Sequence, residues 1–178
     1  MAEFGTALDE TPDNINMLSP LVWKFQLHRA PTLNYFVQNI NLPGVHLPPV
    51  AEHNPFVQIP HPGDHLQFDD LMINFKVDED FANWLEIFNW MKALGYPNNF
   101  EERAALEDPT LQLGHGVRSD ISLIVLNSQR IPSFDIVFRD AFPISLSSAI
   151  FDVTQASVKY IDAAATFTYI SYDINPIN

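Results

Sequence analysis

The sequence contains no cysteine among its 178 residues, and basic residues are scarce. Without cysteine, disulfide bonds, thiolate metal sites and cysteine nucleophiles are excluded, so packing must stabilise the fold. Lys and Arg number 9 against 22 Asp and Glu, which gives a formal net charge of -13. This charge has the wrong sign for a protein that grips phosphate groups, which argues against a conventional nucleic-acid binder.

Long apolar segments are missing as well. No stretch reaches the ~18 apolar residues that span a bilayer, because Pro, Asp, Asn or Lys interrupts each candidate. Residues 1–18 are acidic and lack the basic start and apolar run of a signal peptide. We therefore expect a soluble protein without an N-terminal export signal.

Charged residues make up only 17% of the chain, against about 25% in typical soluble proteins. Because apolar residues make up 47%, we expect some apolar surface to serve contacts with partners. The length predicts one domain, residues 21–178, and the polar composition of residues 1–20 predicts a flexible N-terminal arm.

Alternation of apolar and polar residues predicts a mainly β protein. Prolines recur between residues 43 and 67, where we expect an extended loop or edge hairpin with one short strand at residues 56–59. Residues 98–116 are polar and predict a long exposed loop, and residues 140–149 predict a link between strands. The segments predicted as strands are 21–28, 35–42, 68–77, 121–126, 133–139, 157–161 and 163–173.

Residues 78–95 change to a helical period. Asp78 is the expected N-cap, and Gly95 followed by Pro97 is the expected stop. Trp90 lies away from the predicted apolar stripe, so we expect it to pack on a neighbouring subunit. That stripe consists of Phe81, Trp84, Leu85, Phe88 and Met91.

Together these elements predict an antiparallel β-barrel or sandwich of six to eight strands, with one amphipathic helix packed against it.

No group of residues predicts catalysis. His53, His61, His65 and Asp64 are the only cluster that resembles metal ligands, but Pro60 and Pro62 preclude a regular helix that would bring them together. We interpret the acidic residues as boundary and capping residues, and we expect no enzymatic activity, metal or cofactor. The acids are Asp69, Asp70, Asp78, Glu79 and Asp80, and the residues that fail to form a triad are Ser122, Ser145, Ser147, Ser148 and His115.

The order of elements resembles the tail-tube superfamily of contractile bacteriophage tails, which includes tube subunits and the baseplate proteins that initiate the tube. The most specific part is a strand that runs through an acidic turn into a Trp-rich helix. Three stretches show the likeness: Trp23-Lys24-Phe25-Gln26-Leu27 with Asn41-Leu42-Pro43-Gly44-Val45, then residues 75–91, and Ala165-Thr166-Phe167-Thr168-Tyr169-Ile170-Ser171-Tyr172.

The resemblance implies hexameric rings that stack into a tube, bound by adjacent tube or baseplate hub rings and by sheath or baseplate proteins. It implies a virion protein assembled in the host cytoplasm, without contact to a membrane. DNA would pass an acidic lumen without specific binding. Residues 1–20, 44–67 and 98–117 are the expected contact segments, and the candidate interface residues are Trp90, Pro48, Pro49, Phe56, Ile59, Phe100, Leu111 and Leu113.

Two alternatives remain open at this point. The related tube protein of secretion systems shares the fold and stacks in the same way. A monomeric β-barrel that binds a small ligand would instead need an apolar internal cavity.

Overall fold

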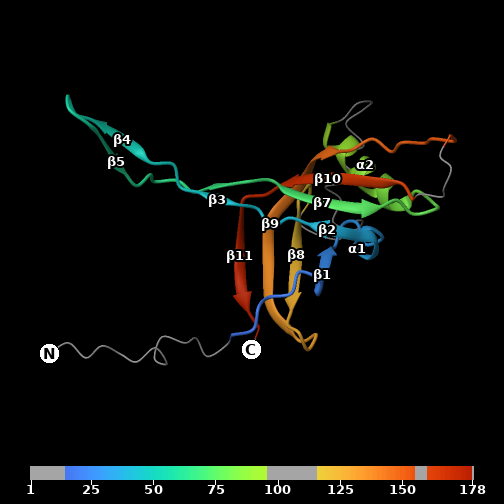
Figure 1. Ribbon diagram of the computed structural model, residues 1–178. Coiled ribbons are helices and arrows are strands. Elements are labelled where there is room, and N and C mark those ends of the chain that lie inside the picture. Colours follow the sequence, from blue (N-terminus) through green and yellow to red (C-terminus); the bar gives the residue numbers. More distant parts are fainter. Residues whose placement is uncertain (1–14, 96–115, 155–159, 178) are drawn as a thin grey trace.

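A computed structural model describes residues 15–95, 116–154 and 160–177 (Figure 1). Antiparallel strands are the main regular structure in this part of the chain. The elements in chain order are β1 (Trp23–Leu27), α1 (Leu33–Phe36), β2 (Val37–Ile40), β3 (Val45–His46), β4 (Val50–His53), β5 (Gln58–His61), β6 (Gln67–Phe68), β7 (Leu71–Lys76), α2 (Ala82–Gly95), β8 (Ser119–Leu126), β9 (Pro132–Leu146), β10 (Asp162–Thr168) and β11 (Ser171–Pro176).

Seven strands form one hydrogen-bonded sheet in the order β1-β8-β9-β10-β7-β2, with β11 also paired to β9. The 15-residue strand β9 bends through this sheet and belongs to two halves of it (Figure 1). Its first part pairs with β8 and β11, and its last part pairs with β10. We call the half made of β1, β8, β9 and β11 sheet A, and the half made of β9, β10, β7 and β2 sheet B.

Both halves contribute alternate side chains to one core, which α1 and α2 extend. This arrangement confirms the predicted fold class, a mainly antiparallel β protein with a helix packed against it. The side chains with the least exposure include Leu27, Leu33, Leu71, Ile73, Phe75, Ile87, Ile121, Phe138 and Phe167.

The buried face of α2 differs from the predicted stripe. Leu85 and Phe88 are exposed, whereas the helix buries Asn83, Ile87, Trp90 and Ala93. Asn83 explains the difference, because its Nδ2 donates to the Lys76 carbonyl at 2.7 Å and its Oδ1 accepts from the Asp78 amide at 3.4 Å. These bonds hold Asn83 inward and so fix the rotation of the helix.

Several strand boundaries also differ from the sequence prediction. Residues 33–36 form α1 instead of the start of a strand, and β9 continues through the region predicted as a link. The predicted last strand is two strands, because the chain leaves sheet B after β10 and enters sheet A with β11. Ile170 lies at this crossing and donates its amide to the Arg139 carbonyl at 3.1 Å. Residues 155–159 lie outside the described residues, and they include three of the five positions of the predicted strand 157–161.

The predicted edge hairpin of residues 43–67 is confirmed, although it contains four short strands where one was expected. β3 pairs with β6, and β4 pairs with β5, in two separate two-stranded ladders. We call residues 45–68 the projecting hairpin, because they extend away from both sheets (Figure 1).

Candidate subunit interface

Sheet A has two open edges. Within the described residues, β1 pairs only with β8 and β11 pairs only with β9. Every pairing in sheet A is antiparallel, so strand directions alternate from β1 to β11. Open edges of this kind present unpaired backbone groups to another chain.

The outward groups of β1 follow from its bonds to neighbours. The Val22 carbonyl accepts from the Leu126 amide at 3.1 Å, so the alternate residues Trp23, Phe25 and Leu27 direct their backbone groups away from β8. Leu27 is already satisfied, since Asn34 bonds its amide at 2.8 Å and its carbonyl at 3.3 Å. Trp23 and Phe25 therefore form the open part of this edge.

The same reasoning applies to β11. The Ile177 amide donates to the Ser133 carbonyl at 2.9 Å, in line with the register that pairs Ser171 with Arg139. Odd-numbered residues therefore face β9, and Tyr172, Ile174 and Pro176 face outward. Proline has no amide hydrogen, so Tyr172 and Ile174 are the residues that offer both a donor and an acceptor.

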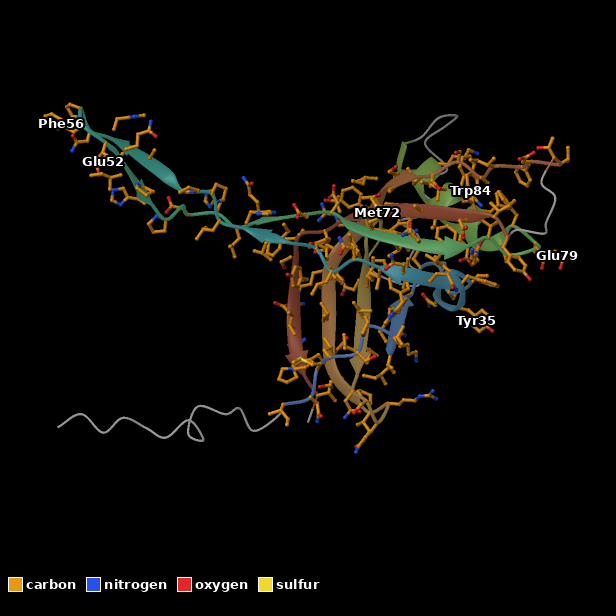
Figure 2. The ribbon with its side chains drawn as sticks, in the orientation of Figure 1. Tyr35, Glu52, Phe56, Met72, Glu79 and Trp84 are labelled. Carbon is orange, nitrogen blue, oxygen red and sulfur yellow. The ribbon has the colours of Figure 1, made fainter. Side chains whose placement is uncertain are left out.

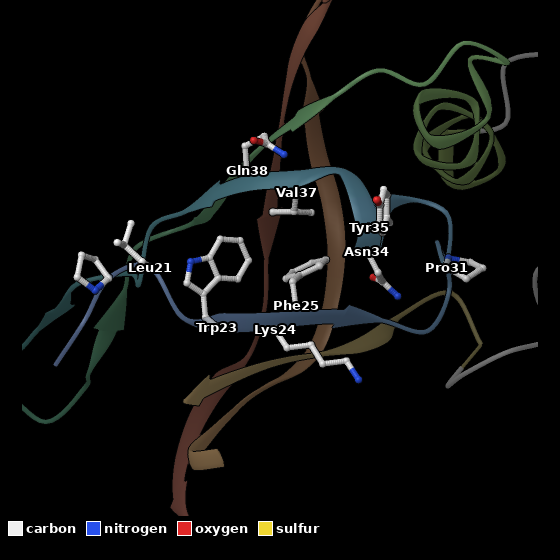
Figure 3. A pocket seen from close by; sticks show the side chains of 10 residues that line it. Leu21, Trp23, Lys24, Phe25, Pro31, Asn34, Tyr35, Val37 and Gln38 are labelled. Carbon is white, nitrogen blue, oxygen red and sulfur yellow. The ribbon is translucent and has the colours of Figure 1, made fainter. Parts of the chain in front are cut away.

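A groove of about 610 Å³ lies beside the open edge of β1 (Figure 3). The side chains of Trp23, Phe25 and Val37 point into the space between β1 and β2. Lys24 points away from this space, as alternation along β1 requires. The groove thus offers an apolar wall next to unpaired backbone groups.

The face of sheet A opposite the core is polar and close to neutral. We call this the wall face, and cross-strand registers place its residues together. It carries two cations and three carboxylates, so the net charge of -13 is not concentrated here. The residues are Lys24, Gln26, Asp120, Ser122, Ile124, Asp135, Val137, Arg139, Ser171, Asp173 and Asn175.

Arg139 is held by Asp173 on the wall face, with 2.7 Å between Nε and Oδ2. The hydrogen bond and charge of Asp173 raise the pKa of Arg139, and the carboxylates of Asp120 and Asp140 add to this effect. Lys24 is exposed and forms no ion pair within the described part of the chain.

The projecting hairpin exposes apolar side chains on both sides of its tip. Phe56, at its tip, is 95% exposed, and Val50 and Ile59 are also exposed (Figure 2). Gly63 allows the two halves of the hairpin to approach closely, because a Cβ at this position would lie 2.1 Å from the Pro48 carbonyl oxygen. Exposed apolar side chains gathered on one segment are typical of a contact site.

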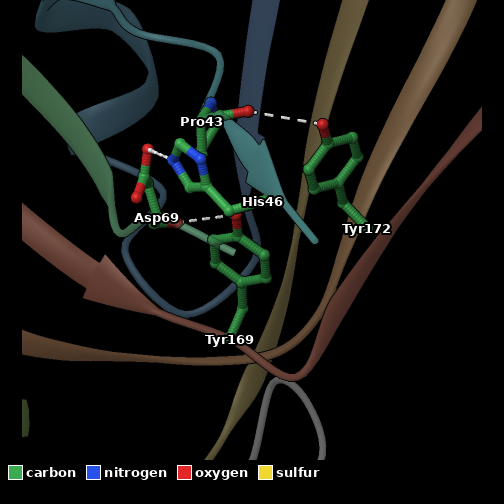
Figure 4. Close-up of polar contacts among 5 residues, drawn as sticks. All are labelled: Pro43, His46, Asp69, Tyr169 and Tyr172. Atoms are coloured by element: carbon green, nitrogen blue, oxygen red, sulfur yellow. Dashed lines mark hydrogen bonds and ion pairs between the residues drawn. The ribbon is translucent and has the colours of Figure 1, made fainter. Parts of the chain in front are cut away.

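Polar and aromatic contacts fix the base of the projecting hairpin (Figure 4). The Tyr169 hydroxyl donates to the Asp69 carbonyl at 2.8 Å, and the Tyr172 hydroxyl donates to the Pro43 carbonyl at 3.3 Å. His46 Nε2 lies 3.2 Å from Asp69 Oδ2. Burial, with the nearby Tyr172 and Asp69 adding to it, raises the pKa of Tyr169 to about 12.

Trp90 is not on the surface, which corrects the expectation that it packs on a neighbouring subunit. It is only 3% exposed, and its Nε1 donates to the Val117 carbonyl at 3.0 Å. The Arg29 guanidinium lies 5.1 Å from the centre of its ring. Burial beside this ring lowers the pKa of Arg29. The rotation of α2 set by Asn83 directs Trp90 inward.

The other predicted interface residues divide into two groups. Pro48, Pro49, Phe56 and Ile59 are exposed on the projecting hairpin, which brings them together on one segment. The remaining three, Phe100, Leu111 and Leu113, lie outside the described residues, as does His115.

Several of the residues considered for chemistry have structural partners. The Asp78 carboxylate accepts from the Asn83 amide at 3.2 Å, so it caps α2 from outside the helix, which begins at Ala82. His61 pairs with Glu52 across the hairpin at 2.8 Å. The Ser147 hydroxyl accepts from the Ala164 amide at 2.8 Å. Among the described residues, no three His, Asp or Glu side chains form a group that could hold a metal.

Sequence reasoning was only partly right about the predicted apolar stripe of α2. Trp84 and Met91 are partly buried and pack against the core, as predicted, whereas Phe88 is exposed. The rings of Phe81, Trp84 and Phe88 stack in succession, 5.0 Å and 5.2 Å apart, and Phe151 lies 6.2 Å from Phe81. Their helical spacing assigned these residues to the core. The signal that could have corrected this is Asn83, a polar residue whose capping bonds require the inward position.

Comparisons with known proteins define the fold. No family model and no curated protein matches the chain. A chain of the sheath-tube complex of an extracellular contractile injection system, PVC, in its extended state gives a TM-score of 0.59 at 15% identity, over 97% of this chain and all (100%) of that one. A chain of the 6-fold symmetrised baseplate of the anti-feeding prophage gives a TM-score of 0.58 at 11% identity, over 93% of this chain and 96% of that one. Hcp1 from Flavobacterium johnsoniae gives a TM-score of 0.51 at 14% identity, over 88% of this chain and 98% of that one.

At these identities the likeness establishes a shared fold. This chain therefore has the tail-tube fold, as the sequence resemblance implied. No helix in the described residues is long and apolar enough to cross a membrane.

Proposed function

We propose that this chain is a structural, non-enzymatic subunit whose copies join into a ring, and that the rings stack into a tube. The open edges of sheet A carry this proposal. Since strand directions alternate over its four strands, β11 of one copy is antiparallel to β1 of the next. A contact between two different edges is heterologous, and such contacts close into rings when the rotation permits.

Six copies per ring is the stoichiometry we propose. The 6-fold symmetry of the anti-feeding prophage baseplate supports it, because a chain of that assembly shares this fold. Joining the sheets in this way turns the wall faces of all copies toward the centre of the ring, where they surround a channel.

The projecting hairpin is the proposed contact with an adjacent ring. Pro48, Pro49, Phe56 and Ile59 lie on it and are exposed in the single chain. Covering apolar surface contributes about 25 cal/mol per Å², so a few such side chains contribute substantially to stacking. Tube, baseplate and sheath proteins are the partners we propose.

We propose that the tube belongs to a phage tail and that the genome passes through its channel. The wall face presents Arg139 already bound by Asp173, and its three carboxylates outnumber its two cations. Because unpaired cations are what hold phosphates and Lys24 alone has no ion pair among the described residues of this face, DNA would slide past such a surface. The second candidate role is the tube of a contractile injection system, which the fold shared with PVC favours.

Light scattering on the purified protein, followed by negative-stain imaging, tests the ring. Rings or short tubes are the expected result. A 20.2 kDa particle at high concentration, without assembly on tail or baseplate partners, would overturn the proposal and favour the ligand-binding barrel.

A further inference from the structure

The structure assigns one register to the contact between copies, in which Lys24 of one copy pairs with Asp173 of the next. This inference rests on the proposed ring and adds the residues that specify it. The two edges of sheet A supply the geometry, and their charges supply the selectivity.

Backbone groups select the register. Among the described residues, each edge offers two residues whose outward amide and carbonyl have no backbone partner: Trp23 and Phe25 on β1, and Tyr172 and Ile174 on β11. One antiparallel register uses all of them, with Phe25 opposite Tyr172 and Trp23 opposite Ile174. A shift that sets Phe25 opposite Ile174 would leave Tyr172 facing Leu27, whose groups Asn34 occupies, and Trp23 facing Pro176, which lacks an amide hydrogen. The opposite shift would leave Phe25 facing Ile170, whose amide already bonds the Arg139 carbonyl.

The side chains on the core side of β1 and β11 support the same register. Phe25 is buried on the core side of β1, and Tyr172 lies opposite the core residue Phe138. Ile174, which is 52% exposed in the single chain, would lie beside Trp23 at the groove described above. Continuing the sheet therefore covers apolar side chains with apolar side chains.

The same register sets Lys24 directly opposite Asp173 on the wall face. Lys24 is exposed and has no ion-pair partner in the described part of its own chain. Arg139 binds Oδ2 of Asp173, which leaves Oδ1 for the ammonium group of the next copy. Arg139, Asp173 and the neighbouring Lys24 would form a row of alternating charge at every subunit boundary.

Charge reversal tests the pairing. Lys24→Asp alone and Asp173→Lys alone set like charges at every boundary, and each should raise the protein concentration for half-maximal ring formation roughly tenfold. A 1:1 mixture of the two variants restores opposite charges at both kinds of boundary when copies alternate, so rings should return at the wild-type concentration. The double variant Lys24→Asp/Asp173→Lys should form rings alone.

Glu79→Lys is the matched control, because it makes the same charge change as Asp173→Lys at an exposed site away from both edges. Circular dichroism confirms that each variant is folded. Rings of Lys24→Asp at the wild-type concentration, or a mixture that fails to assemble, would overturn the pairing while leaving the ring intact. Absence of rings in the wild type would instead overturn the proposed function.

Discussion

Asn83 is fully buried on the inner face of α2, where its side-chain amide bonds the Lys76 carbonyl and the Asp78 backbone amide. Asn83→Ala would leave these buried groups without a partner, and such groups cost about 1–3 kcal/mol each. We expect the free energy of unfolding to fall by about 2 kcal/mol in urea denaturation. Asn89→Ala, at an exposed position of the same helix, should change it by less than about 0.5 kcal/mol. Equal effects of the two substitutions would contradict the anchoring role of Asn83.

The raised pKa of Tyr169 predicts that the free energy of unfolding falls at alkaline pH. Its pKa is raised from 10.0 to about 12 in the folded chain. The unfolded chain therefore releases the phenol proton first, so this contribution to stability is complete below pH 10 and is lost as the pH rises toward 12. Tyr169→Phe should flatten the decline of unfolding free energy across this window, measured by urea denaturation at several pH values.

The same substitution removes the hydrogen bond to Asp69 and should lower stability at neutral pH by about 1 kcal/mol. Tyr35→Phe is the control, because Tyr35 is 85% exposed. An unchanged pH profile in Tyr169→Phe would show that other groups cause the alkaline decline.

At the scale of elements, alternation predicted the strands that bury one face. Leu71, Ile73 and Phe75 of β7 are buried as predicted, and the β8–β9 hairpin forms near the predicted turn. Alternation could not locate the break before β11, because both β10 and β11 direct one face to the core and the pattern continues across the crossing. The spacing of apolar residues did not predict the buried face of α2, because the hydrogen bonds of the polar residue Asn83 fix the rotation of the helix.

The interface was only partly predictable for a related reason. Prolines and exposed apolar residues indicate that residues 43–67 form an edge segment, and they do. Open edges, however, depend on which strands end up unpaired, and this is a property of the whole topology. No local pattern in residues 23–27 or 171–176 distinguishes an outer strand from an inner one.

Substitution of Gly63 tests whether the close approach at this residue holds the projecting hairpin together. Gly63→Ala would force the strands apart, because the new Cβ would lie 2.1 Å from the Pro48 carbonyl oxygen. We expect faster amide exchange over residues 45–68 and weaker stacking of rings, while the thermal midpoint of the core stays close to the wild type. Gly95→Ala is the control, since nothing lies within 4 Å of a Cβ there. Unchanged exchange in the hairpin would contradict the close approach.

For the whole molecule, the distribution of charge matters more than its sum. The chain has a net charge of -13, yet the wall face carries only one carboxylate more than it has cations. In the proposed ring the channel is therefore close to neutral. With Lys24 paired to Asp173 of the next copy, the channel would lack free cations and would not bind DNA, with no need for a strongly acidic surface.

Ser122→Lys/Asn175→Lys tests this property, since it changes the wall face from -1 to +1 per copy and the chain from -13 to -11. Glu79→Gln/Asp80→Asn also gives -11, but it changes exposed residues away from that face. We expect assembled rings of the first variant to bind labelled double-stranded DNA at about 50 mM salt and to release it near 200 mM, because phosphate contacts weaken steeply with salt. Rings of the control and of the wild type should bind none. Equal binding by both variants would show that DNA responds to total charge, and the wall face would then not line the channel.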